Sequence, residues 1–398
     1  MRKRLAVLLA LLAAAGLAWT WQELYRPYRG YSGNLILILE PGTHASQAAT
    51  ILVARGVLER RWPFLVRYWL GRPRHTLKAG EYLFDRPLRP IDVYRKLIQG
   101  DVYLHGVIIP EGSDRFDMAR ILHQQLGLGP EEFLRVTEQA SAIRDLDPQA
   151  ATLEGYLFPD TYRFPRGVSS ATVVATMLAR FRHVLDSKFP PDLRASAEKL
   201  HDVITLASLV EKETPTPSER PLIAGVFARR LEKRWPLQCD PTVVYAARLN
   251  HRPIGPITQR DLDFDSPYNT YRYAGLPPGP IASPGEASIR AAFNPEPGDF
   301  LYFVSNNRGG HIFSRTLAEH QRNVARYRRE VGALRRAAAG KVKPPKQASD
   351  SGRRGKTGVT TSSSKGDKGQ QQEATHPRSL PSAGPGTRRG ARDPRPPG

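Results

Sequence analysis

The chain is nearly free of cysteine and lacks the residue groupings that hold metals or nucleotides. Cys239 is the single cysteine among 398 residues, so no disulfide can form within the chain. No Cys or His residues have the spacing of metal ligands, no glycine-rich phosphate loop follows a predicted strand, and no serine stands in a nucleophile elbow. We therefore expect neither a metal nor a cofactor. The candidates left for chemistry are carboxylates, namely Glu211, Glu213, Glu219 and Asp240.

The net charge of +21 is unevenly distributed along the chain. Residues 332–398 hold 15 Lys or Arg and 4 Asp or Glu, a net charge of +11, which leaves +10 for the rest. Because that remainder is only moderately basic, we expect no nucleic-acid partner. From about residue 337 the sequence is rich in Gly, Ser, Pro, Lys and Arg without an apolar period, which predicts a disordered basic tail over 337–398.

The N-terminus carries a pattern typical of a membrane anchor. Three cations at 2–4 precede an uncharged, largely apolar run at 5–22, which places the start in the cytoplasm and the bulk of the chain outside. The run has about the minimum length of a spanning helix, and Trp19 and Trp21 suit the far interface. We therefore predict an uncleaved single span. A cleaved signal peptide is the alternative, because the Ala-x-Ala at 13–15 resembles a cleavage site.

The region between the anchor and the tail has the pattern of an α+β fold. A small α/β module is predicted from strands at 34–39 and 80–84 and helices at 45–55, 62–70 and 90–99. A second strand, turn and helix at 107–128 loosely repeats the first. Further helices are expected at 170–189 and 193–214 and after Thr316, with Ser218 as the N-cap of another helix and a hairpin at 300–314.

A segment at 268–280 is punctuated by Pro and Gly, which predicts irregular structure. Long irregular loops inside compact domains are usually functional. Tyr268, Tyr271 and Tyr273 could stack on sugar rings, or they could simply pin the loop to the core. His311, beside the predicted hairpin turn, is a further site candidate, although a lone histidine in a strand is more often structural.

Glu211 stands where the predicted helix 193–214 ought to bury an apolar side chain. The residues before it at helical spacing are Leu200, Val203, Ile204 and Ala207. Pro215 and Pro217 end the helix, so Glu211 lies in its last turn. A carboxyl half-buried among apolar side chains favours its neutral form, as a general acid in glycoside cleavage requires. The alternative is a carboxylate that reaches solvent from a frayed helix end.

Six ordered motifs resemble those of one protein family. They are LEGYLFPDTY at 153–162, ASLVEKET at 207–214, LQCDPTV at 237–243, YNTY at 268–271, GLPPG at 275–279 and GGHIF at 309–313. Together they are similar to the endolytic murein transglycosylases, also called YceG-like proteins, over about residues 35–327. Cys239 departs from the pattern, because a small or hydroxyl residue is usual there. The basic tail lies outside it.

The resemblance implies three parts: an anchor at 1–30, a LysM-like module at 31–102 and a catalytic α+β domain at 103–336. Composition alone adds the tail at 337–398. It also implies an enzyme outside the cytoplasmic membrane that cuts peptidoglycan glycan strands within the chain, linked to wall-synthesis complexes. Glu211 would be its catalytic acid. The residues expected to bind substrate are Gln238, Asp240, Tyr268, Asn269, Tyr271 and His311.

The implied reaction breaks the bond between N-acetylmuramic acid and N-acetylglucosamine. Glu211 would protonate the linking oxygen and then take the proton of the sugar's own C6 hydroxyl, which closes a 1,6-anhydro ring. Two alternatives stay open. One is a hydrolytic muramidase in which Asp240 positions water, and the other is a non-catalytic, membrane-anchored scaffold that binds the wall through its LysM-like module.

Overall fold

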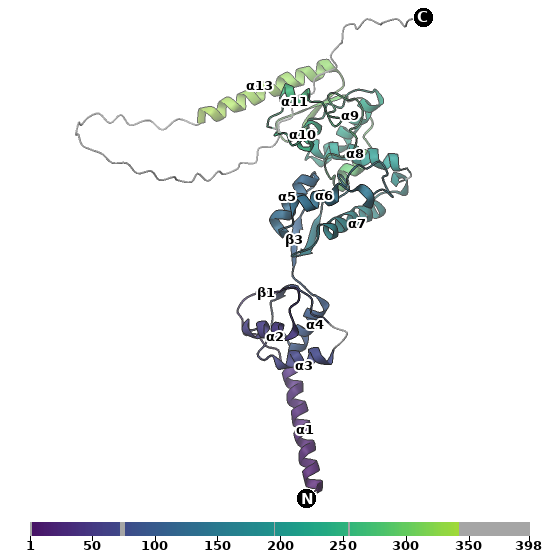
Figure 1. Cartoon of the computed structure of the whole chain (residues 1–398). Coiled ribbons are helices and arrows are strands. Elements are labelled where there is room, and N and C mark those ends of the chain that lie inside the picture. Colours follow the sequence, from purple (N-terminus) through teal and green to yellow (C-terminus); the bar gives the residue numbers. More distant parts are fainter. Residues whose placement is uncertain (1, 72–75, 195, 254, 342–398) are drawn as a thin grey trace, which may run out of the picture. The chain divides into compact units, whose positions relative to one another are not determined.

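The computed structural model describes residues 2–71, 76–194, 196–253 and 255–341 (Figure 1). The fold is mixed α+β, mostly helical, with three small antiparallel sheets of two strands each among the described residues. The chain forms two compact units. One comprises residues 1–142 with 151–183, and the other comprises 143–150 with the chain from 184 on.

The first unit begins with α1 (Arg2–Tyr25), none of whose residues is buried. Among the described residues it is the one helix long and apolar enough to cross a membrane, although an N-terminal signal sequence would have the same features. The pattern at 2–22 thus correctly predicts an apolar N-terminal helix.

A small α/β module follows α1 in the same unit. β1 (Leu35–Leu39) pairs antiparallel with β2 (Gly80–Phe84), with Leu37 opposite Tyr82. Alternate residues of β1 point inward, so that Leu37 and Leu39 are buried in a core with Leu52, Phe64 and Leu97. The helices that supply the rest of this core are α2 (Ala45–Ala54), α3 (Trp62–Leu70) and α4 (Pro90–Gln99). The predicted elements of this module are confirmed.

The rest of the first unit is built on β3 (Leu104–Ile108), which pairs with β4 (Thr161–Pro165). Its helices are α5 (Arg115–Leu126), α6 (Pro130–Thr137) and the part of α7 (Ser170–Lys188) up to residue 183, with a short 3-10 turn η1 (Ala140–Ala142). The aromatic motif at 153–162 runs into β4. Leu153, Tyr156 and Leu157 in it are almost fully buried, so the motif fills the core of this unit.

The second unit is organised around α8 (Ala197–Glu213), which packs against α9 (Arg220–Glu232), α10 (Asp240–Leu249) and α12 (Glu286–Phe293). It also contains the 3-10 turns η2 (Pro191–Arg194) and η3 (Pro217–Glu219) and the short α11 (Gln259–Leu262). The predicted hairpin is confirmed as β5 (Tyr302–Ser305) and β6 (His311–Ser314), and α13 (Leu317–Lys341) packs against both strands.

Several predicted boundaries differ from the structure. Ser218 is not a helix N-cap, because 217–219 form the 3-10 turn η3 and Glu219 takes that position before α9. The helix expected from residue 193 begins at Ala197, where the Ser196 hydroxyl accepts a hydrogen bond from the Lys199 N–H. Thr316 does cap α13, by accepting from the Glu319 N–H at 3.2 Å. α13 runs to Lys341, into the predicted tail, and the rest of the tail lies outside the described residues.

Candidate active site

The site is centred on the last turn of α8, where a buried helix stops abruptly. Leu200, Ile204 and Ala207 on α8 are fully buried, which fixes the helix against its neighbours. The helix ends at Glu213 because Thr214, the residue before Pro215, is extended with φ −139° and ψ 131°. Glu211 and Glu213 therefore lie at the very edge of the core, on a rigid element that can fix their positions.

The Glu211 carboxyl contacts two donors from different parts of the second unit. Oε1 accepts a hydrogen bond from the Arg220 guanidinium at 2.9 Å, and Oε2 accepts one from the backbone N–H of Gly285 at 3.0 Å. The side chains of Glu211 and Arg220 are 5% and 9% exposed. Both donors stabilise a negative carboxylate and fix its orientation. The predicted apolar surroundings are thus wrong in one respect, because a guanidinium also contacts the acid.

The loop that leads to Gly285 follows one face of α8. The His201 ring contacts the carbonyl of Pro278, the Ser208 hydroxyl accepts from the Ile281 N–H at 3.0 Å, and Glu211 accepts from Gly285. His201, Ser208 and Glu211 lie on one side of the helix because they are seven and three residues apart. Three points along this Pro- and Gly-rich loop thus contact α8 at His201, Ser208 and Glu211, and these contacts hold the loop beside Glu211.

His201 is itself fixed from the other side by a buried carboxylate. Its Nδ1 lies 2.7 Å from the Asp147 carboxylate, and this hydrogen bond raises the pKa of His201. Asp147 belongs to the short segment 143–150 that is part of the second unit. The pair therefore fastens the start of α8 to a distant part of the sequence.

Arg220 is placed by the turn before it, which is bound to the β5–β6 hairpin. Glu219 accepts from the His311 N–H at 2.8 Å and lies 2.7 Å from His311 Nδ1, and the Thr216 hydroxyl donates to the Gly309 carbonyl at 2.8 Å. A Cβ on Gly310 would lie 2.5 Å from a Glu219 oxygen, so a side chain at this position would force the Glu219 carboxylate to shift. The hairpin thereby fixes the residue next to Arg220.

The second acid of the turn, Glu213, has different neighbours. Burial raises its pKa to about 7, while a hydrogen bond with the Cys239 thiol and the charge of Arg230 act in the opposite direction and Asp240 adds to the rise. Burial also raises the pKa of Cys239 well above its ordinary value. The last turn of α8 therefore holds two different acids. The Glu211 carboxyl contacts the Arg220 guanidinium, and burial favours the neutral form of the Glu213 carboxyl.

Asp240 and Tyr271 are brought together by the structure. The Tyr271 hydroxyl donates to Asp240 Oδ1 at 2.5 Å, and burial raises the pKa of Tyr271. Asp240 begins α10 and is 7% exposed. One of its oxygens is thus occupied, which leaves less of the carboxylate to position a water molecule.

The other residues expected to bind substrate have structural contacts. Asn269 is fully buried, donates to the carbonyls of Leu262 and Phe264, and accepts from the Tyr271 N–H at 3.0 Å. Tyr268 packs on Tyr245 with ring centroids 5.1 Å apart. These contacts pin residues 268–271 to the core. Tyr273, by contrast, is 47% exposed and donates to Asp265 at 2.7 Å.

Gln238 and His311 also make contacts that shape the backbone. Gln238 adopts a left-handed conformation with φ 52°, and its N–H donates to Thr270. His311 is bound to Glu219, as described above. Neither residue is among the contacts of Glu211, whose hydrogen-bond partners are Arg220 and Gly285.

Sequence patterns gave no signal for the contacts of Glu211. Arg220 looked like an ordinary residue at the start of a helix, and Gly285 contributes only its backbone N–H. Glu219, one of the candidate carboxylates, binds the hairpin through both its oxygens. The one available hint was the order of the residues, because Glu219 and Arg220 follow the proline stop at a distance that lets the chain fold back on α8.

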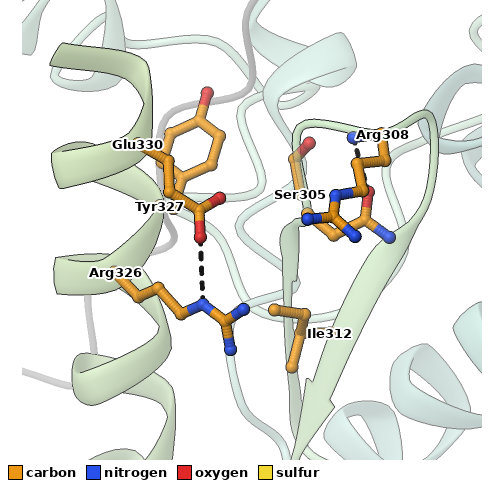
Figure 2. A pocket seen from close by; sticks show the side chains of 7 residues that line it. Ser305, Arg308, Ile312, Arg326, Tyr327 and Glu330 are labelled. Carbon is orange, nitrogen blue, oxygen red and sulfur yellow. Dashed lines mark hydrogen bonds and ion pairs between the residues drawn. The ribbon is translucent and has the colours of Figure 1, made fainter. Parts of the chain in front are cut away.

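A small pocket lies between the β5–β6 hairpin and α13 (Figure 2). It has a volume of about 110 Å³ and is lined by residues of the hairpin and α13, among them Ser305, Arg308, Arg326 and Glu330 (Figure 2). The Arg326 guanidinium binds Glu330 at 3.0 Å along the helix. Ligand pockets are usually ~300 Å³ or larger, so this pocket is too small for a disaccharide. Among the described residues no group of three or more His, Cys, Asp or Glu could hold a metal ion.

The comparisons with known proteins agree with one another. A model of the YceG-like family matches residues 37–326. A Bacillus subtilis protein named endolytic murein transglycosylase is 31% identical over 304 residues, which cover 72% of this chain and 82% of the relative. A protein of the same name from Streptococcus pneumoniae is 29% identical over 72% of this chain and 57% of its own length. A crystal structure of a yceG-like protein from Listeria monocytogenes is 32% identical, with a TM-score of 0.50 and coverage of 73% of this chain and 99% of that one. This chain belongs to the YceG-like family.

Proposed function

We propose that this protein is an endolytic lytic transglycosylase that cuts peptidoglycan glycan strands between N-acetylmuramic acid and N-acetylglucosamine. The observation that carries the proposal is the placement of Glu211. Its carboxyl sits at the end of a rigid buried helix, 5% exposed, with each oxygen on a separate donor. Such fixed orientation is what proton transfer to a glycosidic oxygen requires.

In the first half of the proposed reaction, protonated Glu211 gives its proton to the linking oxygen as the sugar ring develops positive charge. The carboxylate that remains is stabilised by Arg220 and by the Gly285 N–H. In the second half this carboxylate takes the proton of the C6 hydroxyl, whose oxygen closes the 1,6-anhydro ring. Glu211 thus returns to its starting state, and no second carboxylate at fixed spacing is needed.

The partners and location follow from the same proposal. We place α1 across the cytoplasmic membrane as a single anchor, with the residues after it on the outer side, where the glycan strands lie. The module at 31–102 is proposed to be LysM-like, and linkage to wall-synthesis complexes is proposed because the cut strands are their product. The region at 103–336 is proposed as the catalytic domain.

The ends of the products distinguish the candidate functions. Purified glycan strands are incubated with the protein, and the new termini are identified by mass spectrometry. Cuts at internal positions of the strand that leave 1,6-anhydro termini are expected. Reducing ends would replace the transglycosylase with a hydrolase in which Asp240 positions water, and intact strands that nevertheless bind the protein would make it a scaffold.

A further inference from the structure

Helix α3 has a second apolar face besides the one that packs on the core of its module. Phe64 and Tyr68 point inward and are buried, and Leu65 is partly buried against the same core. Trp62, Val66 and Trp69 form an outer stripe, because their spacing places them together on another face, and Arg67 lies between the two faces. At the end of the helix Trp69 and Leu70 are 60% and 76% exposed. An apolar face that does not pack on the core is stable where it leaves water in another way.

The outer stripe of α3 begins at the anchor helix. Trp62 stacks on Trp19 of α1 with ring centroids 5.0 Å apart, and Arg60, just before α3, pairs with Glu23 at 3.9 Å. Tyr25 at the end of α1 lies under the Arg89 guanidinium, 5.6 Å from the ring centroid. The last turns of α1 are therefore bound by the module itself and are not a free linker.

The length of α1 fixes the depth of this contact. Its uncharged run, residues 5–22, has 18 residues, which span about 27 Å at 1.5 Å per residue, close to the ~30 Å of a hydrocarbon core. Trp19 lies only about 6 Å from the far end of that run. If the module stood clear of the bilayer, the span would end before Trp19 and cover only about 21 Å, too short to cross.

From this arithmetic we infer that the outer stripe of α3 lies in the membrane interface, with Trp69 and Leu70 inserted at the level of the lipid headgroups and the first acyl carbons. Tryptophan favours that layer because its ring is apolar and its N–H can still reach water. The module is then seated on the lipid surface by α1 and α3 together. The inference rests on the proposed membrane span.

The test places a polarity-sensitive fluorophore at this face in the full-length protein. Trp69→Cys and Leu70→Cys are each labelled with a nitrobenzoxadiazole group and reconstituted into vesicles of phosphatidylethanolamine and phosphatidylglycerol. Native Cys239 is 1% exposed and its pKa is raised by burial, so it labels poorly, and the parent chain measures that background. The matched control is Ile38→Cys on β1 of the same module, where Ile38 is 50% exposed.

Labels at 69 and 70 are expected to emit at shorter wavelength than the label at 38, to be quenched by nitroxide-bearing lipid, and to be several-fold less accessible to iodide. The Leu70 side chain is mostly exposed, so Leu70→Cys should not disturb the packing of α3. It therefore still tests the inference if Trp69→Cys perturbs the helix. Equal iodide quenching at 38, 69 and 70 in protein that resists alkaline extraction would overturn the inference but leave the anchor. Loss of the protein from the vesicles in alkali would overturn both.

Discussion

Each unit of this protein holds a buried glutamate next to an arginine, and the two pairs differ in a way that bears on function. In the first unit, Glu154 and Arg115 are 3% and 7% exposed, and the guanidinium lies 4.0 Å from the carboxylate. Glu154 accepts a hydrogen bond from the Arg115 backbone N–H at 3.2 Å. In the second unit, the Arg220 guanidinium itself donates to Glu211 at 2.9 Å.

The surroundings of the two acids differ more than their burial does. Glu154 is flanked in sequence by Leu153 and Gly155 and sits within a motif whose large side chains fill the core. Glu211 sits where a helix stops and an irregular loop meets it through Gly285. Burial beside a cation is thus common to a structural and a candidate catalytic acid. What distinguishes Glu211 from Glu154 is its position at the end of a rigid helix, where a loop is held against it.

The largest expected effect is on turnover by Glu211→Gln. The amide keeps the size of the side chain but can neither give the proton nor take it back, so turnover on glycan strands should fall roughly 10²–10⁴-fold. The thermal midpoint should also fall, because the amide leaves the buried Arg220 guanidinium without its carboxylate, so turnover is compared per folded molecule.

Glu286→Gln is the matched control for that variant. Glu286 follows Gly285 directly and also pairs with an arginine, Arg290 at 2.6 Å, but its side chain is 40% exposed. Its loss should leave turnover close to that of the parent. A folded Glu211→Gln protein that cut strands at the parent rate would move the chemistry to another carboxylate, and Asp240 would be the first to examine.

The next effect is on stability, through Arg220→Gln. Removing one partner of a buried ion pair leaves an uncompensated charge, at a cost of roughly 3 kcal/mol. Urea unfolding of the variant and the parent at pH 7 measures this loss.

A double variant sharpens that prediction. Once Glu211→Gln has removed the charge, Arg220→Gln should cost clearly less than it does alone, because the two residues act as a pair. Strictly additive losses would mean that Arg220 stabilises the fold through contacts other than Glu211.

Much of the fold follows from local patterns, whereas the contacts of the site do not. The strands and helices of the small module and the hairpin match their apolar periods, and Glu211 is singled out because it interrupts an apolar stripe. Glu219 and Arg220 reach the site only when the chain folds back after Pro217, and Gly285 reaches it through a loop 74 residues away from Glu211 in the sequence. No period in the sequence encodes such a return, so their roles could not be predicted.

The same reason explains the substrate candidates. Asn269 and Tyr268 stand in a segment whose Pro and Gly content predicts a loop, but composition does not say whether a loop residue faces ligand or core. Asn269 is buried with its amide bound to two carbonyls, which only the folded structure reveals.

The comparison of the two glutamates predicts that Glu154→Gln affects stability and leaves the chemistry intact. The amide loses the charge that faces Arg115, so we expect a loss of about 2 kcal/mol in the free energy of unfolding. Turnover per folded molecule should stay near the parent value. If turnover collapsed while urea unfolding was unchanged, Glu154 would act in the reaction, and the distinction drawn between the two acids would be wrong.

The smallest effect concerns the other acid of α8 and depends on pH. Burial raises the pKa of Glu213 from 4.5 to about 7. In the unfolded chain this carboxyl ionises at its ordinary pKa, so the stability it contributes is present below about pH 4.5 and is lost as the pH rises to about 7. Glu213→Gln cannot ionise. At pH 8 the variant should therefore unfold at a higher urea concentration than the parent, with a free energy of unfolding larger by on the order of 1–2 kcal/mol, because the carboxyl is only partly shielded from water. At pH 4 the two proteins should be equally stable. Glu198→Gln, in the exposed first turn of the same helix, should show no such rise with pH. A Glu213→Gln variant no more stable than the parent at pH 8 would mean that Glu213 is solvated like an ordinary surface carboxylate.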